Sequence, residues 1–126
     1  MMSAADLEAR ATTLRTVEEV EAFLREHADC ALFKAGSCHL TASALDTIAP
    51  VLDLNPSLPL GLIRVVESRP ASQRLAELTG VRHASPQILL IRDGRVVHAR
   101  DNWEISSAAL REALGEFFDS DQRALP

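Results

Sequence analysis

A β-hairpin near the C-terminal end is the strongest constraint that the sequence places on the fold. Residues 88–91 and the pair Val96-Val97 are apolar, and Asp93-Gly94 lies between them. An Asp-Gly pair favours a two-residue turn whose central residues both take positive φ, and this turn joins neighbouring antiparallel strands. The last two strands are therefore expected to be antiparallel neighbours.

Helical and strand patterns alternate ahead of this hairpin. Thr16 and Glu19 form a capping-box pattern before apolar residues with helical spacing, which predicts a helix to about His27. The other expected elements are strands at residues 30–35 and 59–67, a helix that starts at Ser37, a helix at residues 68–79, and a helix after Ser106 with Leu110, Ala113, Leu114, Phe117 and Phe118 on its inner face. This order predicts an α/β fold of three layers, with a central mixed four-stranded sheet flanked by helices.

The length of 126 residues, 47% of them apolar, fits one domain that can bury a core without metal or disulfide. We expect a loosely ordered N-terminal extension over residues 1–15, the folded domain over residues 16–119 and a frayed tail over residues 120–126.

Charge and cysteine content exclude several classes of function. The net charge is −5 and the basic residues are dispersed, which argues against nucleic-acid binding. Asp6 and Glu8 interrupt the opening stretch, and no window reaches the ~20 apolar residues of a membrane span, so a cytoplasmic protein without membrane contact is expected. In that reducing compartment we expect no disulfide, and the C-x7-C spacing of Cys30 and Cys38 fits no zinc site.

Cys38 is the candidate reactive residue. It follows a predicted strand and lies in the first turn of a predicted helix, where unpaired N–H groups and the helix dipole favour a thiolate. Lys34, four residues upstream, is the candidate cation that supports this thiolate. The alternative is that Cys38 is a small buried apolar residue.

The sequence resembles the YtxJ-like monothiol bacilliredoxins, thioredoxin-like proteins of bacteria that use bacillithiol as their low-molecular-weight thiol. The resemblance runs from about Thr16 to Leu114. It is clearest in LFKAGSC, in VVESRPASQRLAELTGVRHASPQILLIRDGRVV and in the step Asn102-Trp103. It implies a thioredoxin-like fold and a cytoplasmic thiol-disulfide oxidoreductase of the stress response.

Two parts of the site follow from this resemblance. Cys38 matches the single attacking cysteine of the family. Ser85-Pro86 matches its cis-proline element, whose backbone would hold an extended substrate segment beside the sulfur. An ordinary loop proline is the alternative for Pro86.

The active turn departs from the family. Where the family usually has Cys-Pro-Ile-Ser, this chain has Cys38-His39-Leu40-Thr41. Without the proline, His39 has a backbone N–H to donate toward Cys38, and a protonated imidazole would further support the thiolate.

Thr41 stands where a dithiol enzyme keeps its resolving cysteine, so the resemblance implies a monothiol reaction. Cys38 would attack the mixed disulfide of an S-bacillithiolated protein and keep bacillithiol as its own adduct until a second thiol removes it. Bacillithiol is then a co-substrate, and no bound cofactor or metal is expected. Its malate carboxylates are candidates to meet Arg69, Arg82 or His83, each of which is otherwise solvated surface.

Four other residues have both a structural and a functional interpretation. Cys30 is interpreted as a small core residue, with a remote redox partner as the alternative. Trp103 either flanks the cleft or packs beside the last helix. His27 and His98 show no metal-ligand spacing and are expected at the surface.

Two further functions stay open. A glutaredoxin-like reductase would use another low-molecular-weight thiol or a thioredoxin-type reductant. A non-catalytic module would grip partner peptides along Ser85-Pro86, with Cys38 incidental.

Overall fold

The computed structural model describes the backbone of residues 3–124 and the side chains of residues 3–115. Its elements are α1 (Ala4–Arg10), β1 (Thr12–Thr13), α2 (Val17–Glu26), β2 (Cys30–Ala35), α3 (His39–Asp53), β3 (Leu60–Arg64), α4 (Arg69–Thr79), β4 (Gln87–Arg92), β5 (Arg95–Asp101), a 3-10 turn η1 (Asn102–Glu104) and α5 (Ser107–Ala124). The strands form one mixed sheet in the order β1-β3-β2-β4-β5, and β4 is antiparallel to both β2 and β5. The α/β class is confirmed, but the sheet has five strands where four were predicted.

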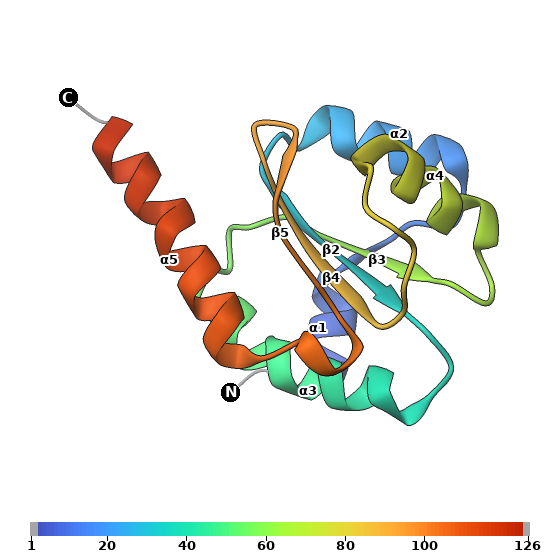
Figure 1. Cartoon of the computed structure of the whole chain (residues 1–126). Coiled ribbons are helices and arrows are strands. Elements are labelled where there is room, and N and C mark those ends of the chain that lie inside the picture. Colours follow the sequence, from blue (N-terminus) through green and yellow to red (C-terminus); the bar gives the residue numbers. More distant parts are fainter. Residues whose placement is uncertain (1–2, 125–126) are drawn as a thin grey trace.

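Helices cover both faces of this sheet (Figure 1). α2 and α4 pack against each other on one face, and α1, α3 and α5 lie on the other. The central strand β2 is wholly buried, and its side chains alternate between the two cores. Cys30 and Leu32 belong to the core under α2 and α4, whereas Phe33 and Ala35 belong to the core under α3 and α5.

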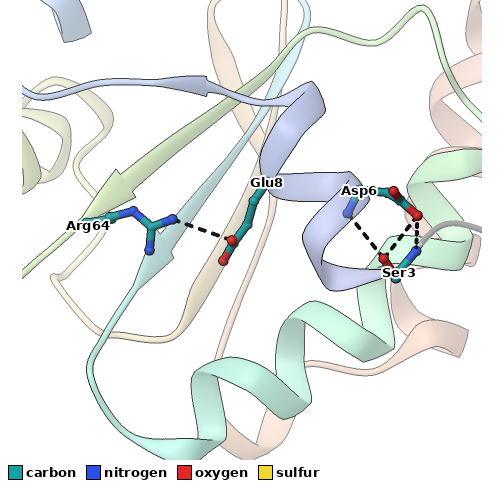
Figure 2. Close-up of polar contacts among 4 residues, drawn as sticks. All are labelled: Ser3, Asp6, Glu8 and Arg64. Atoms are coloured by element: carbon teal, nitrogen blue, oxygen red, sulfur yellow. Dashed lines mark hydrogen bonds and ion pairs between the residues drawn. The ribbon is translucent and has the colours of Figure 1, made fainter.

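The N-terminal segment is ordered, so the loosely held extension predicted for residues 1–15 is wrong over residues 3–14. Ser3 and Asp6 cap α1 reciprocally, with the Asp6 N–H donating to Ser3 Oγ at 3.2 Å and the Ser3 N–H donating to Asp6 Oδ2 at 3.1 Å (Figure 2). Leu7 is only 1% exposed and belongs to the core on the α3 face. The short helix is therefore part of the domain.

Long-range contacts hold this segment in place. β1 adds a parallel edge to β3, with Thr12 opposite Gly61, and Glu8 forms an ion pair with Arg64 at 3.5 Å (Figure 2). The Arg10 guanidinium donates to three carbonyl oxygens at 2.6–2.8 Å, those of Leu52, Asn55 and Leu58. A seven-residue helix and a two-residue strand show too little periodicity to be predicted, and their stability comes from partners 42 to 56 positions away.

The C-terminal helix is longer than predicted. The backbone of α5 is helical through Ala124, where a frayed tail was expected from residue 120. Leu110 and Leu114 are buried as expected. Phe117 and Phe118, the other predicted inner-face residues, lie outside the described side chains.

The predicted hairpin is confirmed. Asp93 and Gly94 have φ of 52° and 76°, so both central residues of the turn take the positive φ that such a turn requires. Within the described part of the chain, no helix is both long and apolar enough to cross a bilayer.

Candidate active site

Four segments of the chain meet at one edge of the sheet. Because β2 and β3 are parallel and β4 is antiparallel to β2, the ends of β2 and β3 lie beside the start of β4. Lys34 pairs with Gln87, and Gln87 pairs with Asp101, so the end of β5 reaches the same edge. Cys38, three residues beyond the end of β2, is therefore placed at this edge.

The Ser85–Pro86 peptide lies beside the turn that carries Cys38. It is cis, as the resemblance implied. A Cβ built on Gly36 would lie 3.1 Å from Ser85 Oγ, which shows how closely the two loops approach. The Asn102 N–H donates to the Pro86 carbonyl at 3.0 Å and so anchors the segment after β5 to the same element.

Cys38 is exposed and is the N-cap of α3, in extended conformation. The helix starts one residue later than predicted, with Cys38 rather than Ser37 at its cap. Its side chain accepts no capping hydrogen bond, and its carbonyl accepts the Thr41 N–H at 3.1 Å, so the sulfur lies at the positive end of the helix dipole. An accessible sulfur at a helix N-terminus is a suitable position for a nucleophilic thiolate.

Thr41 closes the turn that presents Cys38. Its hydroxyl accepts the Gly36 N–H at 2.9 Å, and the residue is only 8% exposed. This bond ties the end of β2 to the first turn of α3. From the sequence, Thr41 was only the residue that replaces a second cysteine; the structure shows that it positions the turn.

Lys34, the predicted supporting cation, has its hydrogen-bond partners on the other face of the sheet. Lys34 alternates with Phe33 and Ala35 along β2, so it points to the face covered by α4, whereas Cys38 caps α3 on the opposite face. Its ammonium lies 3.1 Å from the Ser72 carbonyl oxygen and 3.3 Å from His83 Nδ1. Burial lowers the pKa of Lys34 to about 8.

A polar cluster therefore surrounds the buried Lys34 beneath α4. Ser72 Oγ lies 3.1 Å from His83 Nδ1, and the pKa of His83 is lowered by burial and by the Lys34 ammonium. Gln87, opposite Lys34 in the sheet, donates through Nε2 to the Arg82 carbonyl at 3.0 Å. Sequence analysis missed Ser72 and Gln87, because only the pairing of the strands with α4 brings them together.

Cys30 is the second thiol and is fully buried in β2. Burial, with a smaller contribution from Asp29, raises its pKa to about 12. Its interpretation as a core residue is confirmed. Its thiol is neutral at physiological pH and inaccessible, which is the opposite of what a redox partner needs.

The other candidate residues from the sequence differ in how exposed they are. Trp103 is 83% exposed on η1, one residue from the anchor on Pro86, so it does not pack in the core. His39 is exposed in the first turn of α3. His98 is buried, where a surface position was expected, and burial with the Arg100 charge lowers its pKa. Among the described residues, no group of three His, Cys, Asp or Glu side chains is arranged to hold a metal.

Arg69, Arg82 and His83 do not act as one group. Arg69 and His83 line a common cavity at the start of α4, together with Val65, Val66, Ser72 and Gln73. Arg82 is exposed and is not among the residues that line it.

Comparison with known proteins agrees with this geometry. Residues 12–110 match the family described as monothiol bacilliredoxin BrxC. A solved structure with a thioredoxin fold superposes with a TM-score of 0.75 at 25% identity, covering 85% of this chain and 96% of that chain. Thioredoxin from Fasciola hepatica (TM-score 0.66, 82% and 96% covered) and mitochondrial thioredoxin 3 from Saccharomyces cerevisiae (0.67, 86% and 96%) share the fold at 16% identity.

Proposed function

Because the chain belongs to the monothiol bacilliredoxin family, we propose that it removes bacillithiol from S-bacillithiolated proteins through Cys38. Family and fold make the chain a thioredoxin-like protein with a thiol redox role. The observation that carries the finer proposal is the exposed Cys38 at the N-terminus of α3, beside Ser85–Pro86 and with Thr41 three residues later.

The proposed reaction is two thiol–disulfide exchanges. In the first, the Cys38 thiolate attacks the bacillithiol sulfur of the mixed disulfide; the new bond joins Cys38 to bacillithiol, and the client cysteine leaves as a thiolate. In the second, a free bacillithiol thiolate attacks that adduct, forms bacillithiol disulfide and regenerates Cys38. Across the two steps, one free bacillithiol thiol is oxidised and one client cysteine is reduced, while the bacillithiol of the adduct stays in a disulfide throughout.

The chain's own residues favour this route over an internal disulfide. Thr41 offers a hydroxyl where a resolving thiol would stand, and Cys30 is fully buried. Removal of the adduct from Cys38 therefore requires an external thiol. His39 is proposed to support the thiolate through its backbone N–H and its imidazole.

The cis Ser85–Pro86 element is proposed to hold the client segment. It lies against Gly36 and is anchored through the Pro86 carbonyl to Asn102, so its position is well defined. An extended segment on this loop would run beside Cys38, and the exposed Trp103 is proposed to flank that segment.

Incubation with a bacillithiolated protein, followed by intact-mass measurement of both partners, tests the proposal. We expect the client to lose the mass of one bacillithiol and this chain to gain it on Cys38. Cys30→Ser is the matched control, because it leaves one thiol and is expected to accept the same adduct. Transfer from a glutathionylated client alone would indicate a glutaredoxin-like reductase, and no transfer from either would leave a peptide-binding module.

A further inference from the structure

A cavity of about 340 Å³ opens beside the carboxyl-terminal edge of the sheet. It is lined by the residues that follow β3, Val65 and Val66, and by the first turns of α4. The Val65 N–H donates to the Ala35 carbonyl at 2.9 Å, so the cavity begins next to the end of β2. Cys38 is three residues from Ala35, at most about 11 Å between their Cα atoms. A cavity of this volume suits a small molecule.

The residues that line this cavity carry positive charge. Arg69 is among the lining residues, and none of them is acidic. Lys34 contacts two further lining residues, because its ammonium lies against the Ser72 carbonyl and His83. Neither Arg69 nor Lys34 takes part in the two ion pairs found among the described side chains. A buried ammonium without a carboxylate partner is costly, and an incoming anion would relieve that cost.

The polar cluster also has an unused acceptor. Gln87 is 2% exposed, and its Oε1 is the buried side-chain oxygen that has no hydrogen-bond partner in the described part of the chain. Gln87 lies opposite Lys34 in the β2–β4 pair, on the face covered by α4. Buried polar atoms are normally satisfied, so this oxygen is an exception within the polar cluster that adjoins the cavity.

We propose that this cavity binds the carboxylate end of the low-molecular-weight thiol while its sulfur is joined to Cys38. This inference rests on the proposed function and names the recognition site for its co-substrate. Arg69 forms the forked ion pair with a carboxylate, Ser72 and His83 supply hydrogen bonds, and the Lys34 charge acts from behind them. Val65 and Val66 form the side of the cavity next to the end of β3.

The first test measures binding without turnover. Cys38→Ser, which forms no adduct, is titrated with reduced bacillithiol and followed by amide NMR, with β-mercaptoethanol as the uncharged thiol. We expect bacillithiol to shift the amide signals of Ser72, Gln73 and His83, and β-mercaptoethanol to leave them unchanged. A protein that carries both Cys38→Ser and Arg69→Gln should bind bacillithiol about tenfold or more weakly than Cys38→Ser alone, since one charge-assisted pair is lost. Unchanged signals at these three amides would overturn the cavity as the binding site.

The second test measures turnover on one client protein that carries either bacillithiol or β-mercaptoethanol. Arg69→Gln should lower kcat/KM about tenfold or more for the bacillithiol adduct and less than twofold for the uncharged adduct. Arg82→Gln is the matched control, an exposed arginine outside the cavity, and should change neither. The rate of Cys38 alkylation by iodoacetamide should be the same in all three proteins.

These results separate the two proposals. Equal losses on both adducts, or no loss on either, would overturn the role of Arg69 while the proposed function stands. Shifted amides together with no transfer from any client would overturn the proposed function and leave the binding site in place.

Discussion

The two thiols of this chain lie at opposite ends of one unit, the strand β2 and the turn that follows it. Cys30 begins the strand, where two neighbouring strands and the α2–α4 layer bury it completely. Cys38 caps α3 at the edge of the sheet and is exposed. The same side chain is held neutral at one end and made accessible at a helix N-terminus at the other, so position in the fold decides its chemistry.

Replacement of Cys38 tests the reactive end most severely. Cys38→Ser should abolish removal of bacillithiol and leave the melting temperature unchanged, since oxygen for sulfur at an exposed cap alters nucleophilicity far more than volume. Intact-mass analysis of the client and a thermal melt check the two halves of this prediction. Retained turnover would contradict the proposed mechanism.

Alkylation of the native protein should separate the two thiols directly. Iodoacetamide should modify Cys38 about a hundredfold or more faster than Cys30, because Cys30 is buried and its pKa is raised to about 12. Peptide mapping after timed quenching gives both rates, and a sample in urea gives the rate of the exposed Cys30. Comparable rates in the native protein would mean that β2 opens readily.

Replacement of Thr41 tests the bond that positions the reactive turn. Thr41→Val keeps the shape but leaves the Gly36 N–H without its acceptor, which should lower stability by about 1 to 3 kcal/mol and turnover by about tenfold. Thr41→Ser keeps the hydroxyl and should retain most of both. If the valine and serine variants turn over equally fast, the hydroxyl has no positioning role.

Replacement of Cys30 should lower stability without changing turnover. Cys30→Ser places a hydroxyl in an apolar strand and should cost about 1 to 3 kcal/mol of unfolding free energy with unchanged turnover. Urea unfolding and the client assay measure the two quantities. Lost turnover with an unchanged unfolding curve would instead make Cys30 a redox partner.

The pH dependence of stability should show two buried groups of β2 acting in opposite directions. The pKa of Lys34 falls from 10.5 to about 8 on folding, so the unfolded chain binds more protons above pH 8 and stability rises toward pH 10.5. The pKa of Cys30 rises from 9.0 to about 12, so the folded chain binds more protons above pH 9 and stability falls there.

Two variants separate these contributions. Between pH 7.5 and pH 10, the Lys34→Met protein should lack the rise in unfolding free energy, and the Cys30→Ser protein should lack the fall. Each contribution has a slope of at most about 1.4 kcal/mol per pH unit. Urea unfolding across this range is the measurement. Parallel curves for wild type and either variant would show that the group titrates alike in both states.

Much of the site follows from local sequence. Cys38 comes after an apolar run and before helical spacing, and Pro86 comes just ahead of a strand, so both were placed correctly at the edge of the sheet. The partners of Lys34 were not foreseen, because strand alternation shows which residues share a face but not which helix covers that face. Ser72 carries no motif; it became part of the Lys34 cluster through a contact across 38 positions.

By itself the sequence determined the elements whose cause is local: the hairpin at Asp93-Gly94, the buried runs of β2 and β3, and a cysteine at a strand-to-helix turn. Tertiary structure alone decided that α1 and β1 join the domain and that Arg69 and His83 share a cavity. Turn and periodicity signals lie within a few residues, where φ preferences and side-chain spacing act. The other features depend on partners brought together by sheet pairing and helix packing, and no short window of sequence contains both members of such a contact.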